Sequence, residues 1–207
     1  MSNSVHIRLT LSRSLKVTSS MDPQLNQSGP TLIVLAEHKL PVYDKSGIQL
    51  ATSSFRRPGP EVLDQKIHSN NLLTSILAKI EATAAGADDA LLLDQRDYVA
   101  ETNATHLFFV TNGRVETPTT FACPEGITRA TVLQLCVDHQ IDHAERDIRL
   151  DEALAADEVF CTRTMGELAP VGVVDGRPIG DRVPGPVTGR LITLFRQLVA
   201  REGVPVV

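Results

Sequence analysis

The chain has 207 residues, of which 42% are hydrophobic and 22% are charged, so its composition is that of an ordinary globular protein with one domain, or one domain and part of another. Its formal net charge of -5, with no compensating basic stripe, argues against a nucleic-acid or an anionic-membrane partner. The longest apolar run, residues 31–36, is far shorter than the roughly 20 residues that cross a bilayer.

The three cysteines, Cys123, Cys136 and Cys161, are odd in number and lack C-x-x-C spacing. This pattern indicates neither a disulfide framework nor a zinc site, and no metal site is predicted. A reducing compartment fits such cysteine usage, and we expect a cytoplasmic protein. Because residues 1–21 contain arginine, lysine and serine but no acidic residue, a plastid or mitochondrial address is an open alternative.

Two strands are predicted near the N-terminus, at residues 5–11 and 31–36. The first alternates apolar and polar positions, and the second is a short apolar run. Two strands alone do not form a stable core in water, so another part of a protein has to cover them. The stretch 41–47 has the composition of a linker, and a further strand is predicted to begin at residue 48.

A loop with two prolines, residues 55–60, leads to Lys66 and then to a predicted helix that begins near Asn71. Apolar residues recur at helical spacing along this helix: Leu72, Leu73, Ile76, Leu77 and Ile80. Such a stripe predicts that this face of the helix packs against the core.

The middle of the chain predicts two hairpins and a helix. The first hairpin joins residues 90–93 to residues 98–101, and the second turns at Asn112-Gly113, a dipeptide typical of tight turns. The helix is predicted to take Thr128 as its N-cap and to end near residue 140. Its expected inward face is Val132, Leu133, Cys136 and Val137.

The C-terminal part predicts a short helix at residues 151–157, a strand at 159–161 and a hairpin turned by Asp175-Gly176. A final helix is predicted from Pro186, which suits a first helical turn, and Gly203 stands just past its end. The inner stripe of this helix is expected to be Leu191, Leu194, Phe195 and Leu198.

Lys66 is a candidate nucleophile, since an amine between a loop and a rigid helix can form a Schiff base with a carbonyl compound. A lysine in this position is more often a solvated surface charge. Three downstream segments favour the functional interpretation: Val-Ala-Glu-Thr-Asn-Ala-Thr at 99–105, Pro-Glu-Gly-Ile-Thr-Arg at 124–129, and Thr-Arg-Thr-Met-Gly-Glu-Leu at 162–168.

In this order the segments resemble the class IV aminotransferases that use pyridoxal 5'-phosphate (PLP), in particular the branched-chain aminotransferases and the branched-chain-aminotransferase-like proteins of plants. The resemblance implies an α+β fold with a mainly antiparallel, barrel-like sheet. It also implies that residues 1–40 are the remnant of a small N-terminal α/β domain and that residues 41–207 are the large PLP-binding domain. We therefore expect a chain that lacks most of the small domain.

The same resemblance assigns roles to several residues. Lys66 matches the catalytic lysine that forms the Schiff base with PLP and moves the substrate proton. Glu101 matches the carboxylate that keeps the pyridine nitrogen protonated, so that the ring withdraws electrons. Ile127 and Thr128 match the turn whose backbone amides hold the cofactor phosphate, as the start of a helix is suited to do.

Further matches lie in the segment that follows residue 162. Thr164 matches a threonine that contacts the phosphate, and the backbone of Thr164 and Met165 matches the turn that receives the substrate carboxylate. Arg163 stands where the family has glycine. It either obstructs the site, if that glycine is needed for a positive φ or a close approach, or pairs with the phosphate.

Two other positions depart from the family pattern. Asn71 occupies a place where branched-chain enzymes often carry a tyrosine near the phenolic oxygen of the cofactor. An asparagine can still donate a hydrogen bond there, but the change puts strict branched-chain specificity in doubt. His106 replaces an asparagine that commonly follows the glutamate motif, and we expect a structural effect.

The expected function is PLP-dependent transamination between an amino acid, branched-chain or similar, and a 2-oxo acid, by a homodimer. One alternative is a non-catalytic homologue that has lost activity with its small domain. Others are a D-amino-acid aminotransferase and an aminodeoxychorismate lyase of the same family.

Overall fold

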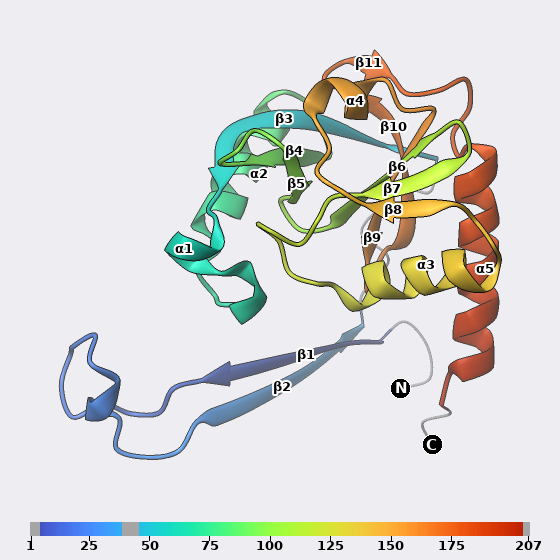
Figure 1. Ribbon diagram of the computed structural model, residues 1–207. Coiled ribbons are helices and arrows are strands. Elements are labelled where there is room, and N and C mark those ends of the chain that lie inside the picture. The colour runs from blue at the N-terminus through green and yellow to red at the C-terminus, as the bar shows by residue number, and fades with distance from the viewer. Residues whose placement is uncertain (1–4, 39–45, 205–207) are drawn as a thin grey trace. The chain divides into compact units, whose positions relative to one another are not determined.

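The computed structural model describes residues 5–38 and 46–204 (Figure 1). The chain divides into two compact units, one formed by Met1–Pro41 with Pro205–Val207 and the other by Val42–Val204. The predicted domain boundary at residue 40 and most of the predicted linker lie outside the described residues.

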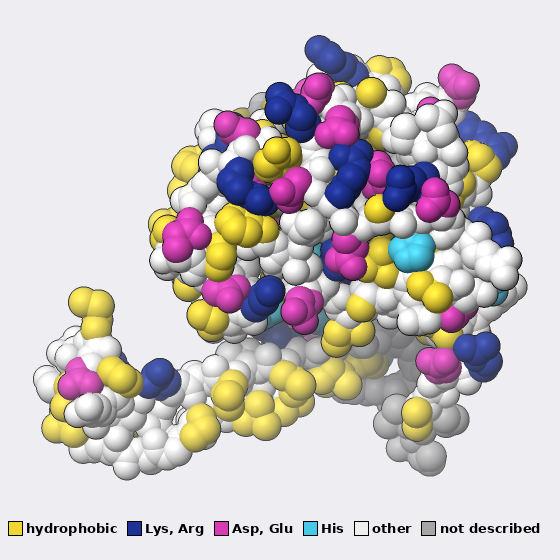
Figure 2. Space-filling view, in the orientation of Figure 1, with side chains coloured by type: hydrophobic (Ala, Val, Ile, Leu, Met, Phe, Trp, Pro, Cys, Tyr) yellow, Lys and Arg dark blue, Asp and Glu magenta, His cyan; other side chains and the backbone are white. Residues whose placement is uncertain are grey.

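In the first unit, β1 (Val5–Ser12) pairs antiparallel with β2 (Thr31–His38), and a short 3-10 helix, η1 (Pro23–Leu25), lies in the connection. The two predicted strands are thus confirmed. Figure 2 shows hydrophobic side chains along this hairpin. The exposed ones are Ile7, Leu9, Leu11, Leu32, Ile33, Val34 and Leu35.

The second unit contains a nine-stranded mixed sheet that curls into a half-barrel, in the order β5-β4-β3-β10-β9-β6-β7-β8, with β11 paired to β10. Its strands are β3 (Ile48–Arg57), β4 (Asp89–Asp94), β5 (Val99–Thr102), β6 (His106–Thr111), β7 (Arg114–Thr117), β8 (His143–Glu145), β9 (Glu158–Arg163), β10 (Glu167–Val174) and β11 (Arg177–Pro178). Strand β3 runs parallel to β4 and β10, whereas β9 is antiparallel to β6 and β10.

Few helices accompany this sheet, which gives the α+β class that was predicted. They are α1 (Pro60–Leu63), the 3-10 helix η2 (Gln65–Ile67), α2 (Leu73–Ala84), α3 (Ile127–Asp138), α4 (Leu150–Leu154) and α5 (Pro186–Glu202). Within the described ranges, none of them has both the length and the apolar character that a bilayer crossing requires.

Strand β6 shows how the core is divided between the two faces of the sheet. Leu107 and Phe109 belong to one hydrophobic cluster, and Phe108 and Val110 belong to another, because successive side chains of a strand point to opposite faces. On the second face Phe108 stacks on Phe160, with ring centroids 4.9 Å apart. Helices α3 and α5 cover this face and contribute Val132, Leu135, Cys136 and Leu191 to the cluster.

Helix α2 exists as predicted, but the prediction of its buried face is wrong. Leu72, Leu73, Ile76 and Ile80 are all at least half exposed, and the buried side chains of α2 are instead Ser75, Ala78 and Ala82. Ala78 and Ala82 pack against Ala90 and Leu92 of β4. Small side chains let the helix approach the sheet closely, and the large apolar residues therefore point away from it.

Two details of α3 also differ from the prediction. Its N-cap is Gly126, with φ 70 and no side-chain hydrogen bond, so Thr128 lies in the first turn and is not the cap. Val137 is 56% exposed, and Leu135 takes the expected inward place. The positive φ of Gly126 suits a residue without a Cβ, which explains why the cap is displaced from Thr128.

The tight turns and the C-terminal helix follow the prediction. Asn112 and Gly113 have φ 51 and 80, which is the geometry of a two-residue hairpin turn, and Asp175 and Gly176 have φ 50 and 73. Helix α5 begins at Pro186 and ends before Gly203, with Leu191 buried and Leu194, Phe195 and Leu198 packed on the second cluster.

Candidate functional site

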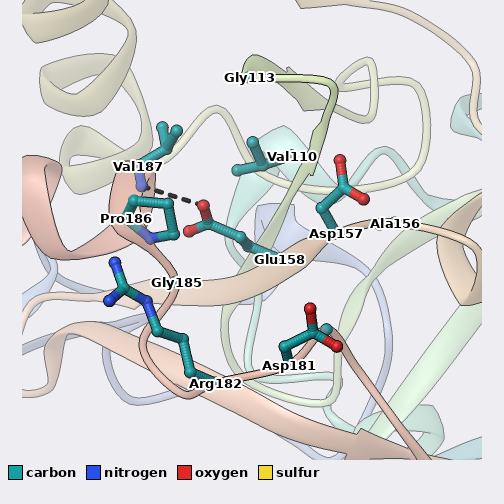
Figure 3. A pocket seen from close by; sticks show the side chains of 11 residues that line it. Val110, Gly113, Ala156, Asp157, Glu158, Asp181, Arg182, Gly185, Pro186 and Val187 are labelled. Atoms are coloured by element: carbon teal, nitrogen blue, oxygen red, sulfur yellow. Dashed lines mark hydrogen bonds between the residues drawn. The ribbon is translucent and has the colours of Figure 1, made fainter.

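A cavity of about 620 Å³ lies where β6, the start of β9 and the start of α5 meet (Figure 3). None of the predicted site residues lines it. Its buried carboxylate, Glu158, accepts hydrogen bonds from the backbone N–H groups of Val187 and Thr188, at 2.9 Å and 2.7 Å. Glu158 therefore caps helix α5, and the predicted site lies elsewhere.

Lys66 lies in η2, between the proline-containing loop and α2. The Asp64 side chain accepts a hydrogen bond from its backbone N–H at 3.0 Å and so fixes this turn. The Lys66 Nζ is 3.9 Å from Oε1 of Glu125, and both side chains are substantially exposed. Such a pair is weak, so the amine is free to leave Glu125 for another partner. The contact brings Lys66 next to the turn that opens α3.

Glu101 is buried on β5, and its Oε1 is 2.9 Å from Nη2 of Arg57 on β3, which is equally buried. Burial raises the pKa of the Glu101 carboxyl to about 7, against the opposing effect of the Arg57 charge. Arg57 also donates to the backbone oxygen of Thr102 at 3.2 Å. In the described part of the chain, its buried Nε has no hydrogen-bond partner.

Arg57 is a candidate site residue that the local sequence did not predict. The adjacent arginines Arg56 and Arg57 both look like surface residues, yet they alternate across the strand. Arg56 pairs with the exposed Asp97 at 2.9 Å, whereas Arg57 points inward to Glu101. Because successive side chains of a strand point to opposite faces, the strand period of β3 could have predicted that only one of the two arginines is buried.

The turn that opens α3 presents the first backbone amides of a helix. These groups have no partner within the helix and lie at the positive end of its dipole, so they suit an anion. The N-cap residue of α3 is Gly126, which has no side chain to bond these amides. Ile127 is 88% exposed and Thr128 is half-buried.

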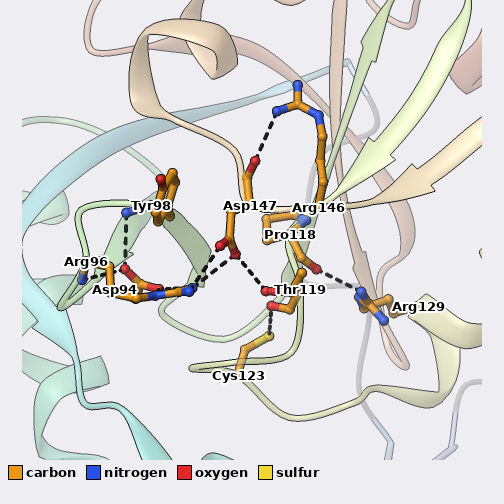
Figure 4. A network of polar contacts seen from close by, with 9 residues as sticks. All are labelled: Asp94, Arg96, Tyr98, Pro118, Thr119, Cys123, Arg129, Arg146 and Asp147. Carbon is orange, nitrogen blue, oxygen red and sulfur yellow. Dashed lines mark hydrogen bonds and ion pairs between the residues drawn. The ribbon is translucent and has the colours of Figure 1, made fainter.

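The loop before this turn is anchored by a polar network (Figure 4). Arg129 donates to the backbone oxygen of Pro118 at 2.8 Å, and Thr119 donates to Asp147 at 2.9 Å. Arg96 bonds both Asp94 and Asp147, and thereby links this loop to the β4–β5 hairpin. The loop is therefore tied to the sheet at its beginning.

The second predicted turn joins β9 to β10. Arg163 is the last residue of β9 and is half-buried, Thr164 is exposed, and Met165 is half-buried. Arg163 is not among the described residues with positive φ, whereas Glu167 is, with φ 55. Arginine therefore fits the backbone at position 163 without left-handed strain. It would obstruct the site only if the cofactor had to approach the backbone closely there. Asn71, just before α2, is exposed.

The buried Cys123 thiol lies in the loop before α3, and several charged residues influence it. Burial and the Glu101 carboxylate raise its pKa to about 12, while Arg129, Arg57 and Lys66 act in the opposite direction. Charges from different elements therefore act on this thiol. The thiol itself is held protonated and is not a nucleophile.

These groups together fit PLP. They include an accessible amine for an aldehyde, a buried carboxylate for a pyridinium nitrogen, and a helix start for a phosphate. The orphaned Nε of Arg57 is a further buried donor beside that carboxylate. Among the described residues, no group of three or more His, Cys, Asp or Glu side chains could hold a metal ion.

Comparison with known proteins agrees with this chemistry. The sequence model of the family described as "Amino-transferase class IV" matches residues 1–174. The branched-chain-amino-acid aminotransferase-like protein 2 of Arabidopsis thaliana is 53% identical over 207 residues, which are 100% of this chain and 37% of that protein. The chain thus spans little more than a third of that relative's length.

Solved structures are also similar. The branched-chain aminotransferase from Thermoproteus uzoniensis with norvaline aligns with a TM-score of 0.89 and 29% identity, over 96% of this chain and 66% of that one. An aminotransferase from Brucella abortus bound to the co-factor PLP aligns with a TM-score of 0.85 and 28% identity, over 95% and 69% of the two chains. The chain belongs to the class IV aminotransferase family.

Proposed function

We propose that this chain carries out PLP-dependent transamination between an amino acid, branched-chain or similar, and a 2-oxo acid. The observations that carry the proposal are the buried pair of Arg57 and Glu101 and the contact that places the Lys66 amine beside Glu125, next to the Gly126 turn. The ligands named for the two similar solved structures, norvaline and PLP, support the same chemistry.

Lys66 and Glu101 carry the reaction in this proposal. When bound, PLP supplies the aldehyde and the electron-withdrawing ring. Lys66 would hold the cofactor through its Nζ, and this amine would move a proton to and from the substrate carbon. The Glu101 carboxylate would hold a proton on the pyridine nitrogen, and the Arg57 charge favours the ionised form of this carboxyl against the effect of burial.

The remaining predicted residues bind and orient. The backbone amides of Ile127 and Thr128 would hold the phosphate, with Arg163 and the Thr164 hydroxyl as further ligands. The backbone of Thr164 and Met165 would receive the substrate carboxylate, and Asn71 would donate a hydrogen bond to the phenolic oxygen of the cofactor.

The two compact units receive an assignment in the same proposal. We infer that the unit with β1 and β2 belongs to the small domain of the family and that Val42–Val204 belongs to the large, PLP-binding domain. We also infer a homodimer. Contiguous exposed apolar side chains such as Ile76 and Ile80 on α2 are characteristic of protein contact surfaces.

The test is an absorbance titration of the purified chain with PLP, followed by borohydride reduction and mass analysis of the peptide that contains residue 66. We expect a saturable band and a reduced adduct on Lys66. Both are absent from Lys66→Ala and present in Lys79→Ala, the matched control, since Lys79 is also half exposed but bonds Asp89 at 3.2 Å. A reduced adduct that survives in Lys66→Ala would refute the assignment.

Addition of substrates then separates the reactions within the family. A shift of the band with L-leucine supports the proposal, whereas a shift with D-alanine alone indicates a D-amino-acid aminotransferase. Release of pyruvate from aminodeoxychorismate indicates a lyase. A chain that forms the Lys66 adduct but responds to none of these substrates binds the cofactor without catalysis.

A further inference from the structure

His106 contacts the turn before α3 at two points. It is the first residue of β6, half-buried, and its Nε2 lies 2.8 Å from the backbone oxygen of Pro124. A carbonyl oxygen can only accept, so Nε2 carries the hydrogen and donates it. Pro124 lies two residues before Gly126, the N-cap of α3.

The second contact is the packing of the imidazole ring on Gly126. A Cβ on Gly126 would lie 2.4 Å from Cε1 of His106 and 2.8 Å from its Nδ1. The ring therefore occupies the space that any other residue at position 126 would fill with its side chain. One side chain thus fixes both the carbonyl before the turn and the glycine within it.

The position of His106 in the sheet makes these contacts rigid. His106 is paired with Thr162 of β9, which is the residue before Arg163.

Burial, followed by the positive charges of Arg129 and Arg57, lowers the pKa of the His106 ring, against the effect of the bond to Pro124. The ring is consequently neutral near pH 7, and it can be buried beside Gly126 without a desolvated charge.

We propose that His106 is a positioning residue that aims the Ile127 and Thr128 amides at the phosphate group of the cofactor. This inference rests on the proposed function and deepens it. The polar network around Arg129, Thr119 and Asp147 anchors the start of the loop, and His106 anchors its end. Because both contacts of His106 are with the turn before α3, we expect its effect on binding to concern the phosphate and not the pyridine ring.

The test compares PLP with pyridoxal, which lacks the phosphate. In His106→Ala the dissociation constant for PLP is expected to rise about tenfold, the size of one hydrogen bond to an oriented group, while that for pyridoxal changes less than about twofold. His106→Gln restores PLP binding, because its amide can donate to the Pro124 oxygen. The matched control is His143→Ala, since His143 also bonds a backbone oxygen, that of Ile141 at 3.0 Å.

A second measurement separates positioning from simple loss of structure. Gly126→Ala is expected to weaken PLP binding more in the wild-type background than in His106→Ala, where the new methyl group no longer meets the ring. In the cofactor-free protein, the Ala130 amide, which bonds the Gly126 oxygen at 3.0 Å, exchanges faster in His106→Ala and normally in His106→Gln.

The outcomes distinguish this inference from the proposed function. If wild-type protein binds neither PLP nor pyridoxal, the proposed function fails and the inference fails with it. If wild-type protein binds PLP but His106→Ala weakens PLP and pyridoxal equally, or weakens neither, the inference alone is overturned. Additive effects of the Gly126→Ala and His106→Ala changes overturn it as well.

Discussion

Glu101 has a carboxyl group whose buried environment changes its titration. Burial raises the pKa of its carboxyl from the ordinary value of 4.5 to about 7 in the folded protein. Between these values the folded chain holds a proton that the unfolded chain releases. The stabilisation is therefore fully present below pH 4.5 and is lost as the pH rises through 7.

We expect the free energy of unfolding of the cofactor-free protein to fall over this range by on the order of 3 kcal/mol from this group alone. Glu101→Gln, which cannot ionise, should show a smaller fall. Urea unfolding at a series of pH values measures the difference. Parallel curves for the two proteins would mean that Glu101 titrates as an ordinary carboxylate.

Arg57 sets how far the Glu101 carboxyl departs from ordinary behaviour. Because the guanidinium lowers the pKa that burial raises, Arg57→Met is expected to move the Glu101 pKa upward, so that the carboxyl is protonated at pH 7. An NMR titration of the carboxyl carbon in the cofactor-free protein measures this pKa. Arg56→Met is the control, since Arg56 pairs with the exposed Asp97, and it should leave the pKa unchanged. An unchanged pKa in Arg57→Met would contradict the role of the pair.

Local sequence predicts some of these residues and not others. The segments around Lys66, Glu101 and Gly126 indicate a cofactor site because each keeps its own short pattern. Arg57 carries no such signal, because its role depends on the pairing of β3 with β4 and of β4 with β5. That pairing brings Arg57 and Glu101 together from positions 44 residues apart, and no local period encodes it.

At the scale of the element, α2 separates what periodicity can and cannot predict. The spacing of its apolar residues correctly predicts a helix, but it does not identify the buried face. The helix has two faces that could be buried, one with large apolar residues and one with Ser75, Ala78 and Ala82. The face with the small residues packs against the sheet. The Glu81 carboxylate reinforces this choice by accepting a hydrogen bond from the backbone N–H of Ser54 at 2.9 Å.

This packing makes a prediction about volume. Ala78 is fully buried against β4, so Ala78→Leu should overpack the interface and lower the free energy of unfolding by about 1–3 kcal/mol. Ile76→Leu is the matched control on the exposed face of the same helix, and it should change stability by less than about 0.5 kcal/mol. Guanidinium unfolding monitored by circular dichroism checks both. A tolerated leucine at position 78 would mean that α2 does not pack closely on the sheet.

At the scale of the molecule, the two units differ in how they are stabilised. All three hydrophobic clusters of buried residues in the described chain lie within Val42–Val204. The β1–β2 hairpin instead exposes its apolar side chains, and a two-stranded hairpin is at best marginally stable in water. The visible face of the larger unit carries intermixed acidic and basic side chains (Figure 2), which favours solubility of that unit.

A chain of residues 46–204 should therefore fold with the same core as the full chain. We expect its melting temperature to lie within roughly 5 °C of the full-length value, since no buried cluster loses a member. Light scattering during heating should also begin later, because an exposed apolar hairpin has been removed. A chain of residues 46–185 is the matched control: it lacks α5, and with it the fully buried Leu191, so its stability should collapse. A melting temperature of residues 46–204 far below that of the full chain would contradict this prediction. It would mean that the hairpin contributes to the stability of the larger unit.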